Sequence, residues 1–145
     1  MHPLSTIALV LALGSASALA QDTPLQTPAR APGGARVFIV SPQDGAEVGT
    51  EVPIVFGAEG VTVAPTSSGA PDSGHHHLLI DVTELPPAGM PIPNDDRHRH
   101  YGQGQTQDTI HLEPGTHTLQ LDFADSRHVQ FEPPLVSPKI TIQVK

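Results

Sequence analysis

Cysteine and tryptophan are absent from this chain of 145 residues, and the missing cysteine narrows its chemistry. Without cysteine the protein has neither a disulfide framework nor a thiolate metal site, so any metal must be held by nitrogen and oxygen ligands. Lysine and arginine number only seven, and the formal net charge is -8. Because no basic cluster is present to neutralise phosphates, the composition argues against a nucleic-acid partner.

The sequence also lacks a helical period of any length, whereas proline (16) and glycine (13) are abundant. Short apolar segments separated by turn residues predict strands instead. These segments cover residues 36–40, 52–58, 75–82, 105–112, 116–123 and 139–145. Short strands at this spacing predict an all-β fold, and more specifically a small antiparallel immunoglobulin-like β-sandwich.

Three parts of the chain differ in composition. Residues 1–20 have the pattern of a signal peptide, because a short apolar run precedes Ala18-Leu19-Ala20, a small-x-small cleavage site. The apolar run is too short to remain as a membrane span after cleavage. Residues 21–34 mix Pro, Thr, Ala and Gly and predict a flexible leader that buries little, and residues 35–145 form the single sandwich domain. We therefore expect a periplasmic or secreted protein.

The most unusual stretch is a histidine triplet, His75 to His77, that runs directly into an apolar strand. Side chains of a strand alternate between its two faces, so His76 shares the more apolar face with Leu78 and Ile80. We expect His76 to point inward as a hydrogen-bonded residue at the edge of the core. His75 and His77 then lie together on the opposite face.

A second pair, His98 and His100, follows about twenty residues later. The predicted topology brings both pairs to one end of the sandwich, provided that the proline-rich connection between them crosses the domain. His128, in the penultimate loop, is expected at the same end. His111 and His117 flank the tight turn at residues 113–115 and are expected at the other end.

Convergent imidazoles in a protein without cysteine predict a transition-metal site, with a copper or zinc ion as the leading cofactor. Each His-x-His step can present two nitrogens to one ion, because alternate residues of an extended chain point the same way. The candidate metal ligands are His75, His77, His98, His100 and His128. Only Met90 remains after the signal peptide, which disfavours a Met-rich Cu(I) carrier. Buffering, sensing or delivery of the metal is the expected function.

Other interpretations of these histidines stay open. They can form a solvated or mutually hydrogen-bonded polar cluster, in which case the domain is a non-catalytic scaffold whose partner is an envelope protein. A metal with an open position and Asp81, Asp95 or Asp96 as the base predicts a hydrolase instead. We rank the enzyme last, because no nucleophile motif such as G-x-S-x-G occurs.

Four segments carry a resemblance to a known family. They are GHHHLLID (74–81), PIPNDDRHRHYGQGQT (91–106), PGTHTLQL (114–121) and PPLVSPKITI (133–142). Over about residues 36–144 the chain resembles a family of exported bacterial domains of unknown function with an HxHxGxGQT pattern. The resemblance implies an immunoglobulin-like fold and export, and it implies no activity.

Overall fold

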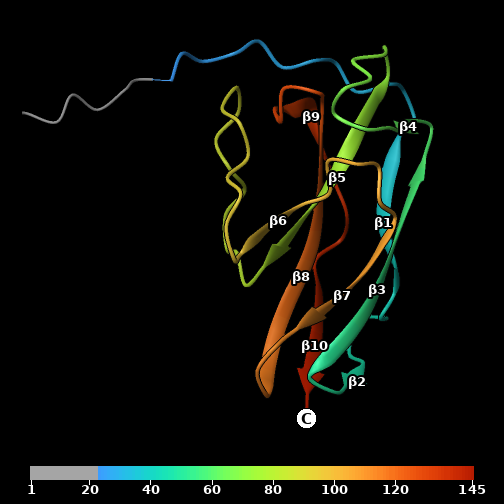
Figure 1. Cartoon of the computed structure of the whole chain (residues 1–145), viewed down its shortest axis with the longest axis vertical. Helices are drawn as coiled ribbons and strands as arrows, with labels where there is room; N and C mark the ends of the chain where they lie inside the picture. Colours follow the sequence, from blue (N-terminus) through green and yellow to red (C-terminus); the bar gives the residue numbers. More distant parts are fainter. Residues whose placement is uncertain (1–22) are drawn as a thin grey trace, which may run out of the picture.

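The computed structural model describes residues 23–145, which form an all-β sandwich without a helix (Figure 1). The strands are β1 (Arg36–Ser41), β2 (Glu47–Val48), β3 (Glu51–Glu59), β4 (Thr62–Val63), β5 (Ser73–Ile80), β6 (His98–His100), β7 (Gln107–His111), β8 (Gly115–Ala124), β9 (Gln130–Val136) and β10 (Ile140–Val144). The all-β prediction is confirmed. The signal peptide expected at residues 1–20 and the first two leader residues lie outside the described residues. Within residues 23–145, no helix has the length and apolar character needed to cross a membrane.

Two sheets face each other. The small sheet has the order β1-β3-β7, and the large sheet has the order β2-β10-β8-β5-β4, with β6 added to β5 and β9 added to β8. Most pairings are antiparallel, but β2 pairs with β10 and β4 pairs with β5 in parallel. Because β1 and β2 belong to different sheets, the chain changes sheet between them. This arrangement fits the immunoglobulin-like type, in which the first, second and fifth strands oppose the third and the last two.

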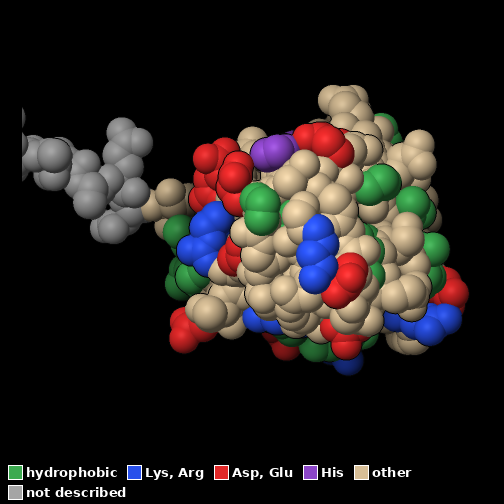
Figure 2. All heavy atoms as spheres, turned by 90° about the horizontal axis from the view of Figure 1, so that it is seen from below, with side chains coloured by type: hydrophobic (Ala, Val, Ile, Leu, Met, Phe, Trp, Pro, Cys, Tyr) green, Lys and Arg blue, Asp and Glu red, His purple; other side chains and the backbone are tan. Residues whose placement is uncertain are grey.

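The core lies between the sheets and follows from the alternation of apolar side chains. On β3 the residues Val52, Ile54 and Phe56 are buried, and on β8 the residues Leu119 and Leu121 oppose them. The same alternation continues on β10 with Ile140, Ile142 and Val144. Buried residues thus recur at every second position of these strands, as the alternation of side chains requires. The face of the domain seen in Figure 2 mixes acidic and basic side chains.

Strand β9 was not expected, because its segment carries Pro133 and Pro134 and was assigned to a loop. It forms a strand at the edge of the large sheet, paired with β8 across a β-bulge. Proline is tolerated at such a position, since an edge strand has unpaired backbone groups on one side. The bulge leaves only three residue pairs in register between the two strands.

The described part of the leader is bound to the domain rather than independent of it. Ala31 donates its backbone N–H to the carbonyl of Glu132 and Ala29 accepts from the N–H of Glu132, so the leader runs beside β9. Ala29 and Ala31 also pack against the core. The backbone pairing and this packing thus attach part of the leader to the domain.

The outer face of the large sheet carries a second, smaller buried layer. It forms because the β5–β6 connection (residues 81–97) and the β8–β9 loop (residues 125–129) fold over this face, with Ile92 N–H bonded to the carbonyl of His128 at 2.8 Å. Leu79, Ile92 and Val129 are buried there, outside the main core. The candidate site lies in this layer.

Candidate metal centre

Strand β5 divides the histidine triplet between the two faces of the large sheet. His76 lies inside the sandwich, where its ring centroid is 5.3 Å from that of Phe56 and 5.0 Å from that of Phe123. His75 and His77 lie on the outer face. All three side chains are fully buried, at 0–1 % exposed. His76 points inward as expected, but neither ring nitrogen has a hydrogen-bond partner, so the expected hydrogen bond is missing.

Four imidazoles meet on the outer face, and we call His75, His77, His100 and His128 the imidazole cluster. Strand β6 pairs with β5 so that His100 lies directly opposite His77. The centroids of the His75 and His77 rings are 4.8 Å apart, and the centroid of His100 is 4.9 Å from that of His75. His128 contacts the other three, with centroid distances between 4.8 and 6.1 Å.

Three members of the cluster present nitrogens close enough together that they could hold a metal ion. One nitrogen each from His75, His100 and His128 lies within 4.8 Å of the others, so these residues could hold a metal ion. The Nε2 atoms of His100 and His128 are 3.1 Å apart. Zinc–nitrogen bonds of about 2.0–2.1 Å place two ligands of a tetrahedral ion about 3.3 Å apart. The His100–His128 spacing already matches that value, and His75 must move closer to complete the set.

The β8–β9 loop holds His128 in place through Asp125. The Oδ1 atom of Asp125 accepts hydrogen bonds from the backbone N–H groups of Arg127 and Val129 at 2.8 and 3.2 Å. Its Oδ2 atom binds the Arg127 guanidinium at 2.6 Å. His128 adopts a φ of 67°, which turns the chain so that its ring faces the cluster. The ring thus sits on an internally bonded turn.

Gly102 leaves room for the ring of His100. A Cβ atom at this position would lie 2.6 Å from His100 Nε2 and closer still to Cε1, which is shorter than any ordinary contact. The imidazole of His100 therefore occupies the space that a side chain at position 102 would fill.

Burial determines the protonation of the cluster. Desolvation, followed by the nearby rings of His100 and His128, lowers the pKa of His75 to about 4. Desolvation and the neighbouring imidazoles lower the pKa of His77 to about 2, and they lower that of His100 as well. These rings are therefore neutral at pH 7, which is the form that binds metals. Both nitrogens of His75 and of His77 lack hydrogen-bond partners.

Asp122 is a buried acid that the sequence analysis overlooked. It is the β8 partner of His77, is 0 % exposed, and has no hydrogen-bond partner on either carboxylate oxygen. Desolvation raises its pKa to about 7. The available signal was its position in Leu119-Gln120-Leu121-Asp122-Phe123, where alternation places it on the same face as Gln120, away from the core.

His98 lies on β6 but is not one of the clustered rings. Its Nδ1 atom is 2.8 Å from Asp95 Oδ1, and the same oxygen accepts the backbone N–H groups of Arg97 and His98. The ring therefore closes a local turn at the start of β6. The structure brings together four of the five ligands expected from the sequence and leaves out His98, because its partner is a carboxylate three residues earlier.

Two further histidines form hydrogen bonds away from the cluster. His111 lies between Glu51 and Glu113, with its Nδ1 atom 2.6 Å from Glu51 Oε1. His117 Nδ1 is 2.7 Å from Asp81 Oδ2, so Asp81 stabilises the corner near the tight turn and does not orient a ring of the cluster. Both histidines are separate from the cluster, as the topology predicted.

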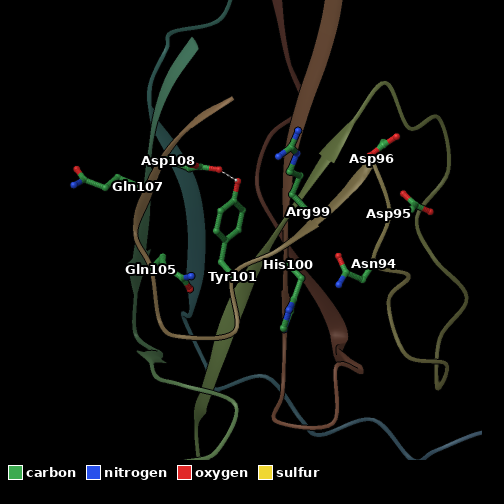
Figure 3. Close-up of a pocket in the computed structure, with 9 residues that line it drawn as sticks. All are labelled: Asn94, Asp95, Asp96, Arg99, His100, Tyr101, Gln105, Gln107 and Asp108. Atoms are coloured by element: carbon green, nitrogen blue, oxygen red, sulfur yellow. Dashed lines mark hydrogen bonds between the residues drawn. The ribbon is translucent and has the colours of Figure 1, made fainter. Parts of the chain in front are cut away.

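A polar cleft of about 500 Å³ adjoins the cluster at His100, between the edge of β6 and the edge of β7. Figure 3 shows Tyr101 reaching Asp108, a hydrogen bond of 2.9 Å, with Arg99 and His100 directed to opposite sides of their strand. Asn94, Asp95, Asp96, Gln105 and Gln107 complete its lining. The cleft brings solvent to the edge of an otherwise buried site.

The fold and the cluster define a small all-β domain in which three neighbouring histidines could hold a metal ion. Residues 54–145 match the model of the family described as Domain of unknown function (DUF4399), and the protein belongs to this family. The predicted resemblance to a family of unknown function is thereby confirmed, and the matched range includes the whole imidazole cluster. No curated protein and no solved structure matches the chain.

Proposed function

We propose that this protein is an exported metal-binding module in which His75, His100 and His128 bind one Cu(II) or Zn(II) ion. The observation that carries the proposal is the mutual approach of one nitrogen from each of these residues to within 4.8 Å. They come from β5, β6 and the β8–β9 loop, so only the folded domain assembles them. Binding would therefore stabilise the folded state.

The chemistry of the ligands favours copper and zinc. Neutral imidazole suits Cu(II), Zn(II) and Ni(II), whereas Ca²⁺ and Mg²⁺ prefer several carboxylate or carbonyl oxygens. Copper(II) forms the strongest complexes of the divalent first-row ions, and zinc accepts a tetrahedral set of nitrogens without strain. The ion would be held for buffering, sensing or delivery in the periplasm or outside the cell, as the signal-peptide pattern suggests.

The buried nitrogens support metal binding over a solvated polar cluster. A polar group buried without a partner typically costs about 1–3 kcal/mol, and His75 and His77 together bury four such nitrogens. A solvated cluster would leave these atoms exposed to water, and they are not. An ion between the rings would satisfy one nitrogen of each ligand.

We further propose that the site binds metal without catalysis. His77 stands beside the three ligands and can fill the position that a catalytic site keeps open for water. Asp95, one of the acids considered as a base, is already bonded to His98 and to two backbone N–H groups.

The test uses the mature full-length protein, purified without a histidine tag. We expect elemental analysis to find one copper or zinc ion per chain, and we expect added Cu(II) or Zn(II) to raise the unfolding midpoint at pH 7.5. At a free ion concentration 100 times the Kd, the gain in unfolding free energy is about 2.7 kcal/mol. Protein that carries no ion and gains no stability from either metal would overturn the proposal and favour the scaffold. Fractionation of the native host separately tests export.

A further inference from the structure

Asp122 has an unusual environment that the three-histidine site does not explain. It lies near the C-terminal end of β8, and its carboxylate is fully buried without a hydrogen-bond donor. Its register partner His77 has the same deficiency, since both of its ring nitrogens are buried without partners. Two adjacent polar side chains, one able to donate and one able to accept, are thus both unsatisfied.

The register places these groups within reach of each other. Side chains of directly paired residues in antiparallel strands lie on the same face, with Cβ atoms about 4.5–5.5 Å apart. Across the large sheet the order at this level is His100 on β6, His77 on β5 and Asp122 on β8. His77 therefore stands between a candidate metal ligand and a buried acid.

We propose that Asp122 is a positioning residue that holds His77 as the fourth nitrogen ligand of the metal, by accepting an N–H from the ring. The inference rests on the proposed function. Metal-binding imidazoles generally donate their second N–H to a carboxylate or carbonyl, which sets the tautomer and strengthens the ligand. Asp122 is the register partner of His77, and no other group in residues 23–145 satisfies its carboxylate.

The charge of the site supports the same assignment. Four neutral imidazoles around a divalent ion leave two positive charges in a buried layer, and burying an uncompensated charge is costly. The Asp122 carboxylate would reduce the net charge to one. The acid that destabilises the metal-free domain would thus stabilise the metal-bound one, and the four-nitrogen site would have no open position for water.

Asp122→Asn tests the inference, with Glu84→Gln on the exposed β5–β6 connection as the matched control for loss of one carboxylate. We expect Asp122→Asn to weaken binding of Cu(II) or Zn(II) about 10–100-fold, measured by competition with a chelator. We expect the metal-free variant at pH 8 to unfold at or above the wild-type temperature, because a buried charge has been removed. Glu84→Gln should change neither quantity.

The same substitution in a His77→Ala background identifies how Asp122 acts. If Asp122 works mainly through His77, Asp122→Asn should cause a clearly smaller loss of affinity in that background than in the wild type. The Cu(II) electron paramagnetic resonance spectrum should show one nitrogen ligand fewer in His77→Ala.

The possible outcomes separate this inference from the proposed function. Wild-type protein that binds no metal overturns both. Wild-type binding with unchanged affinity in Asp122→Asn overturns the positioning role alone, as does an equal loss with and without His77. A metal-free Asp122→Asn that is less stable than the wild type would also overturn it, because the carboxylate would then have a stabilising partner.

Discussion

The Nε2 atoms of His100 and His128 lie 3.1 Å apart, although the residues are separated by 28 positions in the chain. One comes from an edge strand and the other from a loop with a left-handed residue. In the metal-free protein one ring donates its Nε2–H to the other, and to bind an ion through both Nε2 atoms that ring would carry its proton on Nδ1 instead. The pair is the part of the candidate site that is already at ligand spacing.

Removal of either ring should therefore abolish tight binding. We expect His100→Ala and His128→Ala each to lower the affinity for Cu(II) or Zn(II) by at least about 100-fold, which corresponds to about 2.7 kcal/mol. Titration of tag-free protein against a chelator of known affinity measures the change. His111→Ala is the matched control, because it removes an exposed imidazole held by Glu51 and Glu113. Equal losses in all three variants would contradict the site.

His98 provides a sharper contrast, since the sequence alone made it an equivalent of His100. Its ring is bonded to Asp95, so His98→Ala should leave metal affinity within about 2-fold of the wild type. A small loss of stability is expected, because the ring closes the local turn at the start of β6. The same titration, combined with thermal unfolding, checks both values. A 100-fold weaker His98→Ala would place this ring among the ligands after all.

Gly102→Ala should weaken binding although it alters no ligand. The added methyl group would meet the His100 ring, whose Nε2 atom lies 2.6 Å from its position, and would push the ring out of the cluster. We expect roughly a 10-fold loss of affinity, comparable to the loss of a group that orients a ligand. Gly49→Ala, where no atom lies within 4 Å of the new Cβ, is the control. Unchanged affinity in Gly102→Ala would show that the ring can tolerate displacement.

His76→Leu should stabilise the metal-free domain by about 1–2 kcal/mol. The ring lies in the apolar core beside Phe56 and Phe123 with two unsatisfied nitrogens, and leucine removes their desolvation cost. Denaturant unfolding measures the gain. Metal affinity should not change, whereas His77→Leu should weaken it. If both substitutions weaken binding equally, the two faces of β5 do not act independently.

Acid should destabilise the metal-free protein between about pH 6 and pH 4. Burial lowers the pKa of His75 and of His76 to about 4 and, together with the neighbouring rings, that of His77 to about 2, so below pH 6.5 the unfolded chain binds protons that the folded domain refuses. Asp122 acts in the opposite direction, since its raised pKa of about 7 gives the folded state one extra proton in this window. Burial also lowers the pKa of His100, so at least three protons against one leave a net loss of stability as the pH falls, up to about 1.4 kcal/mol per pH unit for each net proton.

Two other histidines do not alter this result. Hydrogen bonds to Glu51 and Glu113 raise the pKa of His111; burial alone would lower the pKa of His117, but its bonds to Asp81 and Glu113 raise it. Their contribution to stability changes only above pH 6.5, because below that pH both histidines are protonated in the folded and in the unfolded state. Unfolding midpoints measured with a chelator from pH 4 to 8 check the prediction. A midpoint that stays constant or rises on acidification from pH 6 to 4 would contradict the buried neutral rings.

The fold could be predicted largely because its strands alternate with period two. The inward faces of β3, β8 and β10 follow from regularly spaced Val, Ile, Leu and Phe residues. The parallel strands β2 and β4 could not be predicted, since each has only two residues. Strand β9 could not be predicted either, because its two prolines interrupt the alternating pattern. The candidate site was predictable in part, because four of the five expected histidines meet.

By itself the sequence determined that His75 and His77 share a face which His76 does not, because a strand reverses its side chains at every residue. It also determined a cysteine-free ligand set. Only the tertiary structure decided that this face is buried, that β6 brings His100 and not His98 to His77, and that Asp122 lies beside them. The physical reason is that pairing register and loop cover depend on contacts between segments far apart in the chain, which no local pattern encodes.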